Sequence, residues 1–247
     1  MKKLLLVIPL IALAACGNVV SDTIEAVKEA GGDFDKGKPI GTSPATVESF
    51  TRLAAMGPDN VIFKTGDSFS IVAEGSAESV DALRYVIEDG RLAIGRKKDS
   101  WNLGKGEAAT ITVTAPSING LALAGSGDMT ADKVSGDDVK LSLAGSGDMR
   151  VGEVTAKKLK GSLAGSGDFV LAGKADNATY SIAGSGSVDA SKLVVTDAVV
   201  SIAGSGDVSI HATGNVEGKI AGSGDINVTG GAKCTSSTAG SGTVSCG

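Results

Sequence analysis

Aromatic residues are scarce in this sequence, and histidine is almost absent. One Trp, two Tyr and five Phe make up 3% of the 247 residues, and there is one His. Aromatic side chains therefore cannot dominate a hydrophobic core, and a thin core of Val, Ile, Leu and Ala stacked repetitively fits better. The shortage also argues against a glycan site built from several aromatic platforms.

Positive charge is also limited, because 23 Lys and Arg residues stand against 28 Asp and Glu residues, a formal net charge of −5. A chain with this balance lacks the basic surface that attracts phosphate groups. The sequence therefore predicts no nucleic-acid partner and no electrostatic binding to anionic lipid.

The N-terminus has the features of an export signal. Lys2 and Lys3 precede an apolar run over residues 4–13, which is too short to span a bilayer and is typical of a signal peptide. The run ends in Leu13-Ala14-Ala15-Cys16, which resembles the lipobox of bacterial lipoproteins. This resemblance implies a signal peptide over residues 1–15 and an acylated Cys16. A cleaved signal followed by a chance cysteine is the alternative.

Residues 16–45 are predicted to form a flexible tether after the acylated cysteine, with a short helix around Val20 to Ala30. Gly17, rather than Asp, follows the cysteine, which is typical of an outer-membrane address in a Gram-negative cell. We therefore expect a lipid-anchored envelope protein whose head lies in the periplasm or at the cell surface, with the membrane as its partner through the N-terminal lipid.

Glycine is abundant, and much of it lies in an internal repeat. Ala-Gly-Ser-Gly occurs seven times, at successive steps of 20, 20, 19, 20, 18 and 18 residues. The copies begin at Ala124, Ala144, Ala164, Ala183, Ala203, Ala221 and Ala239. A repeat of this length indicates a structure that stacks one unit on the next.

The aligned copies alternate between apolar and polar columns. The position before each alanine is apolar except in the last copy, with Leu123, Leu143, Leu163, Ile182, Ile202, Ile220 and Thr238. A period of two is that of a β-strand with one buried face. The two glycines of each copy fall on the inward parity and permit positive φ, so the chain can turn a sharp corner there.

These columns predict an all-β fold, a single-stranded parallel β-helix with coils of about 20 residues and Ala-Gly-Ser-Gly turns. The head domain is predicted over residues 46–247, with regular repeats over 117–247. A series of antiparallel hairpins turning at Gly-Ser-Gly has the same periodicity and remains an alternative.

Residues 46–116 lack the repeated turn but have β-like patterns, and we interpret them as irregular first coils that cap the solenoid. Asp89-Gly90 between two apolar segments is a strong hairpin signal. Strands are also expected over residues 60–64, 68–73 and 109–115, and one helical turn over residues 78–83.

Several motifs of this region, taken in order, resemble a known family. They are Gly57-Pro58-Asp59-Asn60-Val61, Asp89-Gly90-Arg91-Leu92-Ala93-Ile94, the strand that runs into Pro116, and the Gly-Ser-Gly turns. Together they resemble the putative auto-transporter adhesin, head GIN domain proteins of bacterial envelopes, over about residues 47–246. The resemblance implies a right-handed parallel β-helix and a role in adhesion or envelope structure. It carries over no catalytic residues.

An aspartate follows the turn in five copies, at Asp128, Asp148, Asp168, Asp207 and Asp225. Stacked coils would place these like charges about one strand spacing apart, where they repel, and a bound cation or ligand would relieve the repulsion. Alternatively, the carboxylates point into water or accept hydrogen bonds from turn amides and serines. We favour the second interpretation and predict no metal site.

Cys234 and Cys246 occupy inward positions of the final copy. An exported protein meets an oxidising compartment, so we predict a disulfide that closes the last coil. Two buried thiols are the alternative, if the two arms of the coil diverge too far.

No constellation of catalytic residues stands out. The turn serines, such as Ser126, recur in every copy, whereas a catalytic serine needs to occur once and needs a base; His211 is expected on the surface. Trp101 lies in a polar stretch and is expected to pack at the solenoid edge, with a sugar or partner contact as the alternative.

We therefore predict a non-enzymatic envelope lipoprotein without a cofactor, with an adhesin-like or structural head. A glycan- or metal-binding module along the repetitive edge is the first alternative, with a surface glycan or envelope protein as partner. A carbohydrate-active β-helix enzyme is the less favoured one, because the columns show no cluster of acids with Arg or Lys.

Overall fold

A computed structural model of the chain describes residues 31–98 and 107–247. Its elements are the 3-10 helix η1 (Phe34–Lys36), the helix α2 (Ala77–Ala82) and the strands β1 (Lys38–Pro39), β2 (Ala45–Thr46), β3 (Arg52–Gly57), β4 (Asn60–Thr65), β5 (Ser70–Glu74), β6 (Leu83–Glu88), β7 (Arg91–Arg96), β8 (Thr110–Ala115), β9 (Gly120–Gly125), β10 (Met129–Gly145), β11 (Met149–Gly165), β12 (Phe169–Gly184), β13 (Val188–Gly204), β14 (Val208–Ala212), β15 (Asn215–Gly222), β16 (Ile226–Thr229), β17 (Lys233–Gly240) and β18 (Val244–Cys246).

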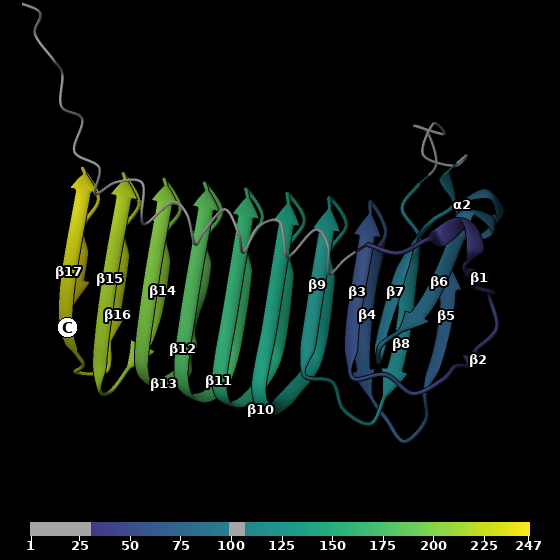
Figure 1. Ribbon diagram of the computed structural model, residues 1–247, viewed down its shortest axis with the longest axis horizontal. Helices are drawn as coiled ribbons and strands as arrows, with labels where there is room; N and C mark the ends of the chain where they lie inside the picture. The colour runs from purple at the N-terminus through teal and green to yellow at the C-terminus, as the bar shows by residue number, and fades with distance from the viewer. Residues whose placement is uncertain (1–30, 99–106) are drawn as a thin grey trace, which may run out of the picture.

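The repeats form a β-solenoid of parallel coils, as predicted (Figure 1). β10 pairs with β11 in parallel, with Met129 opposite Met149 and Ala144 opposite Ala164, so equivalent residues of successive copies are neighbours. Parallel pairing also joins β11 to β12 and β12 to β13, each with one shift of register, between Val151 and Val154 and between Val170 and Ala172. These pairings exclude the antiparallel hairpin alternative for the repeats.

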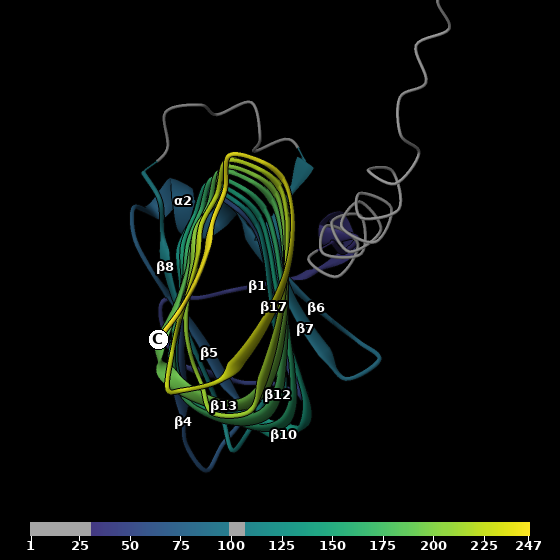
Figure 2. The same cartoon turned by 90° about the vertical axis from the view of Figure 1, so that its left-hand side faces the viewer.

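Each coil runs around a flattened oval, which is visible along the solenoid axis (Figure 2). One long strand, such as β10, covers both sides of the oval and the bend between them, and the Gly-Ser-Gly turn closes the opposite corner. The return path over residues 132–138, expected only as a connection, is therefore itself part of the hydrogen-bonded strand.

The core is the narrow interior of the oval, filled by the predicted apolar columns. Met129, Met149 and Phe169 form one buried column on the side that follows the turn. Size is balanced between neighbouring coils: a side chain at Gly161 would lie 2.7 Å from the Tyr180 ring, so the glycine makes room for the buried tyrosine. Such pairing of large with small residues keeps a thin core closely packed.

The N-terminal end mixes one true coil with antiparallel strands. β3 and β4 form that coil, since β9 pairs in parallel with β3 and β10 with β4. β6 and β7 form the antiparallel hairpin predicted at Asp89-Gly90, and β5 pairs antiparallel with β8. The expected irregular coils are thus partly antiparallel, and α2 lies in the same end of the stack (Figure 1).

The described part of the predicted tether packs on the head. Phe34 of η1 and Ile40 are buried, β1 pairs with β6, and β2 pairs with β5. The expectation of a flexible segment reaching residue 45 was therefore wrong over residues 33–45, because two large apolar side chains there add to the core. Residues 1–30, with the predicted signal peptide, Cys16 and the short helix, lie outside the described residues, as does Trp101.

Candidate functional site

The corner made by the turns is the most regular surface of the molecule. Gly125, Gly145 and Gly165 have φ of 140°, 138° and 125°, in the region that favours glycine. A Cβ on Gly145 would collide with the carbonyl oxygen of Gly125, so no larger residue fits the column. The Gly125 carbonyl accepts the N–H groups of Ser146 (3.0 Å) and Gly147 (3.3 Å) of the next coil.

The predicted aspartates form a hydrogen-bonded ladder beside these turns. The N–H of Asp148 donates to Asp128 Oδ1 at 2.9 Å, and the N–H of Asp168 donates to Asp148 Oδ1 at 3.0 Å. Asp168 accepts the N–H of Ser187, and Asp207 accepts that of Asp225. Each carboxylate thus bonds a backbone amide of the following coil, the interpretation that the sequence favoured.

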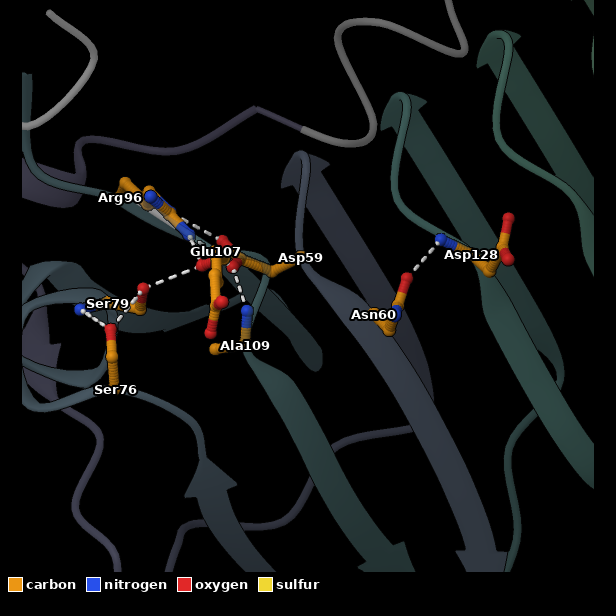
Figure 3. Close-up of polar contacts among 8 residues, drawn as sticks. All are labelled: Asp59, Asn60, Ser76, Ser79, Arg96, Glu107, Ala109 and Asp128. Carbon is orange, nitrogen blue, oxygen red and sulfur yellow. Dashed lines mark hydrogen bonds and ion pairs between the residues drawn. The ribbon is translucent and has the colours of Figure 1, made fainter. Parts of the chain in front are cut away.

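The ladder begins at Asn60 and ends at Thr243, which occupy the position of the aspartate in their coils. Asn60 Oδ1 accepts the N–H of Asp128 at 2.9 Å, so Gly57-Pro58-Asp59-Asn60 stands in the place of Gly-Ser-Gly-Asp (Figure 3). At the other end Asp225 Oδ1 accepts the N–H of Thr243 at 2.8 Å and its hydroxyl at 2.7 Å. These two bonds lower the pKa of Asp225, the hydroxyl bond more than the amide bond.

The ladder gives the carboxylates a structural role. Within residues 31–98 and 107–247, no group of three or more His, Cys, Asp or Glu residues is placed to hold a metal ion. Like charges along a column are tolerated because each one accepts an N–H bond, and Arg150 Nη2 adds a bond of 2.8 Å to Asp148 Oδ2.

The serines of the turns are not paired with the histidine. Ser126, Ser146 and their equivalents are exposed, and their backbone N–H groups serve the coil-to-coil bonds. His211 lies on β14, where its Nδ1 is 3.2 Å from Thr229 Oγ1. The described chain therefore shows no hydroxyl that the imidazole could activate as a nucleophile, apart from this threonine on the next coil.

A buried ion pair, which the sequence reasoning missed, joins the first turn to the cap. Arg96 Nε and Nη2 donate to the two carboxylate oxygens of Asp59 at 2.7 and 2.6 Å, and the Ala109 N–H donates to Asp59 Oδ1 at 2.8 Å (Figure 3). The side chains are 7% and 5% exposed. The bond to Asp59 raises the pKa of Arg96. Asp59 belongs to the Gly57-Pro58-Asp59-Asn60-Val61 motif, but no rule of sequence spacing links it to Arg96.

The same network reaches α2. Ser76 caps this helix by accepting the Ser79 N–H, and Ser79 Oγ donates to the Glu107 carbonyl at 2.6 Å. Arg96 Nη2 donates to that same carbonyl at 3.4 Å. This end of the solenoid is therefore held by polar bonds as well as by packing, and every group described here serves the structure.

The predicted disulfide joins Cys234 to Cys246, with the Cα atoms 6.4 Å apart across the last coil. Cys234 packs against the core, whereas Cys246 is exposed, because no further coil covers this end. The disulfide joins β17 to β18 in this last coil, whereas the inner coils are held by a neighbouring coil on both sides.

A groove lies at the bend opposite the turns. It measures about 570 Å³ and crosses four coils. Its lining includes Ala156 and Ala175, the half-exposed Val194, and the charged Lys157 and Lys174. Lys157 forms an ion pair with Asp137 at 2.9 Å, which raises the pKa of Lys157. The groove crosses enough coils to take an extended ligand.

Comparison with known proteins places these features in a family. The sequence profile of the family described as putative auto-transporter adhesin, head GIN domain, matches residues 49–232. No curated protein matches the chain. In the residues that the structure describes, no helix is long and apolar enough to cross a membrane.

Solved structures share the fold at low sequence identity. A putative adhesin from Bacteroides fragilis is 21% identical, with a TM-score of 0.67 over 84% of this chain and 99% of that one. A putative lipid binding protein from Parabacteroides distasonis is 22% identical, with a TM-score of 0.67 over 85% of this chain and 100% of that one. A putative adhesin from Parabacteroides merdae is 22% identical, with a TM-score of 0.63 over 83% of this chain and 95% of that one.

Proposed function

Because the chain belongs to the putative auto-transporter adhesin, head GIN domain family, we propose that it is a non-enzymatic protein of the bacterial cell envelope. Its solenoid acts as an adhesin-like or structural head. An acylated Cys16 anchors that head in the outer membrane of a Gram-negative cell.

The observation that carries this proposal is the use of the repeated polar groups. The recurring aspartates and turn amides bond from coil to coil, so repetition builds a long, stiff body rather than one reactive centre. A body of this kind suits the display of a surface or the bracing of an envelope layer. The chemistry of the described residues favours neither a nucleophile nor a metal site.

The anchor is supported by the order of basic, apolar and small residues before Cys16. Removing the sulfur by Cys16→Ser should abolish labelling by a fatty-acid analogue and shift the chain out of the membrane fraction. Gly17→Asp is the matched control, because it keeps the cysteine and should leave labelling intact while moving the chain to the inner membrane. Equal labelling of wild type and Cys16→Ser would contradict the anchor.

The side of the membrane is tested by protease treatment of intact cells beside lysed cells. Digestion of the head on intact cells supports the adhesin-like role, because the head then faces the surroundings. Protection until lysis supports the structural role in the periplasm. Recovery of the wild-type head in the cytoplasm would overturn the envelope assignment itself.

The groove at the bend supports a second candidate, a module that binds an elongated glycan. Its floor of small residues and its rim of Lys157, Lys174 and Asp176 offer both apolar contact and hydrogen bonds. Titration with a panel of neutral and acidic oligosaccharides tests it. Binding should be lost in K157A/K174A and kept in K219A, since Lys219 lies on β15 outside the groove. No binding by the wild type would remove this candidate.

A further inference from the structure

One outward-facing column is buried although it lies on the outside of the solenoid. We call it the outer serine face: it consists of Ala122, Ser142, Ser162 and Ser181, two positions before the alanine of each turn, on β9, β10, β11 and β12. Their exposed fractions are 4%, 1%, 4% and 8%. Side chains on an uncovered sheet face keep contact with water. In the next coils Ser201 is half-buried and Lys219 is exposed, so the burial is confined to four coils.

The side chain of Ser162 is a second indication that another segment covers this face. Its hydroxyl is buried and has no hydrogen-bond partner. Buried hydroxyl groups are normally bonded, and an unbonded one costs roughly 1–3 kcal/mol. A serine pointing outward from a sheet reaches water unless another segment lies over it.

The described chain begins at one end of this same face. Phe34 of η1 packs on Ala54, Ala93 and Ala122, which belong to three adjacent strands, β3, β7 and β9. The described chain therefore begins beside β7 and β3, next to the outer serine face. Figure 1 shows these strands following one another along the axis toward β12.

The sequence before this point has the pattern of an amphipathic helix. Val20, Ile24 and Val27 recur at the spacing of one helical face. Asp22, Glu25 and Glu29 fall on the opposite face of the same helix. Such a helix needs an apolar or small-residue surface to cover its stripe, and small side chains let a helix approach a sheet closely.

The lengths agree. A helix over residues 20–30 is about 16 Å long. Four neighbouring strands span about 14 Å at the usual strand spacing. A helix laid along the solenoid axis would thus cover the outer serine face from Ala122 to Ser181 and end before Lys219.

We propose that residues 20–30 of this chain dock as an amphipathic helix on the outer serine face. The segment then runs back along the solenoid, so residue 16 leaves the head beside the later coils and not at the N-terminal end. The docked helix fixes the orientation of the head relative to its N-terminal attachment. The inference does not depend on acylation.

Cysteine cross-linking in the full chain, in total cell extracts, tests the contact. Ser162→Cys is combined in turn with Val20→Cys, Ile24→Cys and Val27→Cys, and mild oxidation is followed over time. At least one of these pairs should form an intramolecular disulfide about tenfold faster than Ser162→Cys with Asp22→Cys or Glu25→Cys, because docking raises the local thiol concentration. Thr130→Cys, on the side of the coil that follows the turn, replaces Ser162→Cys as the second control.

Two results would overturn the proposal. Equal rates for the apolar-face and acidic-face cysteines would mean that the segment does not dock by its apolar stripe. Cross-links that form between molecules rather than within one would assign the face to a second copy of the chain. Unchanged thermal unfolding of the double-cysteine variants before oxidation ensures that the rates report on the native head.

Discussion

At the scale of single residues, the aspartate that follows five of the seven turns accepts a backbone hydrogen bond from the next coil. It accepts the N–H of the equivalent residue one coil later, an amide that the turn geometry leaves without a strand partner. Asn60 performs the same function with a neutral oxygen. The requirement is therefore an acceptor at a fixed position, and the negative charge is secondary.

Replacing Asp148 tests this requirement. Asp148→Ala leaves the N–H of Asp168 without its acceptor and should lower the free energy of unfolding by about 0.5–1.5 kcal/mol. Asp148→Asn keeps an acceptor and should lose clearly less. Urea unfolding of both variants measures the difference. If Asp148→Asn is as destabilising as Asp148→Ala, charge and not the hydrogen bond is what matters.

Two carboxylates, Asp225 of the ladder and Asp189 on β13, predict sensitivity to acid. The Thr243 hydroxyl and amide lower the pKa of Asp225, and the Ser191 hydroxyl and amide lower that of Asp189. A carboxyl whose pKa is lower in the folded state stabilises the fold above its unfolded pKa of about 3.9, and that contribution is lost as the pH falls through the folded pKa. The melting temperature should therefore drop below about pH 4. Asp225→Asn should show a smaller drop; an identical pH profile for it would contradict the assignment.

The buried pair between Arg96 and Asp59 should be costly to break. Asp59→Ala leaves the guanidinium of Arg96 buried without its carboxylate, and the expected loss is about 3–5 kcal/mol in the free energy of unfolding. Asp137→Ala, which removes the exposed partner of Lys157, is the control and should leave stability unchanged within error. Equal effects of the two substitutions in urea unfolding would show that Arg96 finds another partner.

At the scale of elements, the two ends of the solenoid are closed by different means. The N-terminal end is covered by β6, β7, α2 and the packed residues 33–46. The last described coil carries the disulfide, and β17 is exposed along almost its whole length. An open edge of this kind invites strand addition, so its short length and its polar Thr and Ser residues are protective.

Removing the disulfide should loosen the last coils selectively. A bridge across a loop of this size is worth about 2–4 kcal/mol. In C234S/C246S, amide hydrogen exchange should accelerate in β16, β17 and β18 and stay unchanged in β10 to β12, because each coil contacts only its neighbours. Chemical reduction of the wild type should give the same pattern. Uniform acceleration along the chain would contradict this coil-by-coil view.

The sequence predicted those elements that repeat or that rest on local signals. The seven turns and the alternating columns follow from similar residues at nearly equal steps, and the β6–β7 hairpin follows from Asp89-Gly90. The repeat favoured parallel coils, and the structure excludes the antiparallel alternative. The packing of Phe34 and Ile40 and the pairing of Asp59 with Arg96 did not follow. These contacts involve residues that occur once and lie far apart in sequence, so neither period nor spacing indicates them.

At the scale of the whole molecule, the protein is a stack of similar coils on a specialised N-terminal cap. The free energy of unfolding of such a stack is close to the sum of the contributions of the single coils and of the contacts between neighbouring coils. The described repeats share their turns and their buried columns, although single coils carry groups of their own, such as Arg150, Tyr180 and His211. Length can therefore change without loss of the architecture.

Deleting one coil is the most direct test of this claim. Removal of residues 126–145 joins Gly125 to Ser146. Gly125 is the register partner of Gly145, so the new junction keeps the turn sequence, and Gly161 stays beside Tyr180. We expect a folded, shorter solenoid with the same β-sheet circular dichroism and cooperative urea unfolding. Its m-value should be smaller, because the shorter solenoid buries less surface. A deletion variant that fails to fold, or that unfolds without cooperativity, would contradict the view that the coils are equivalent structural units.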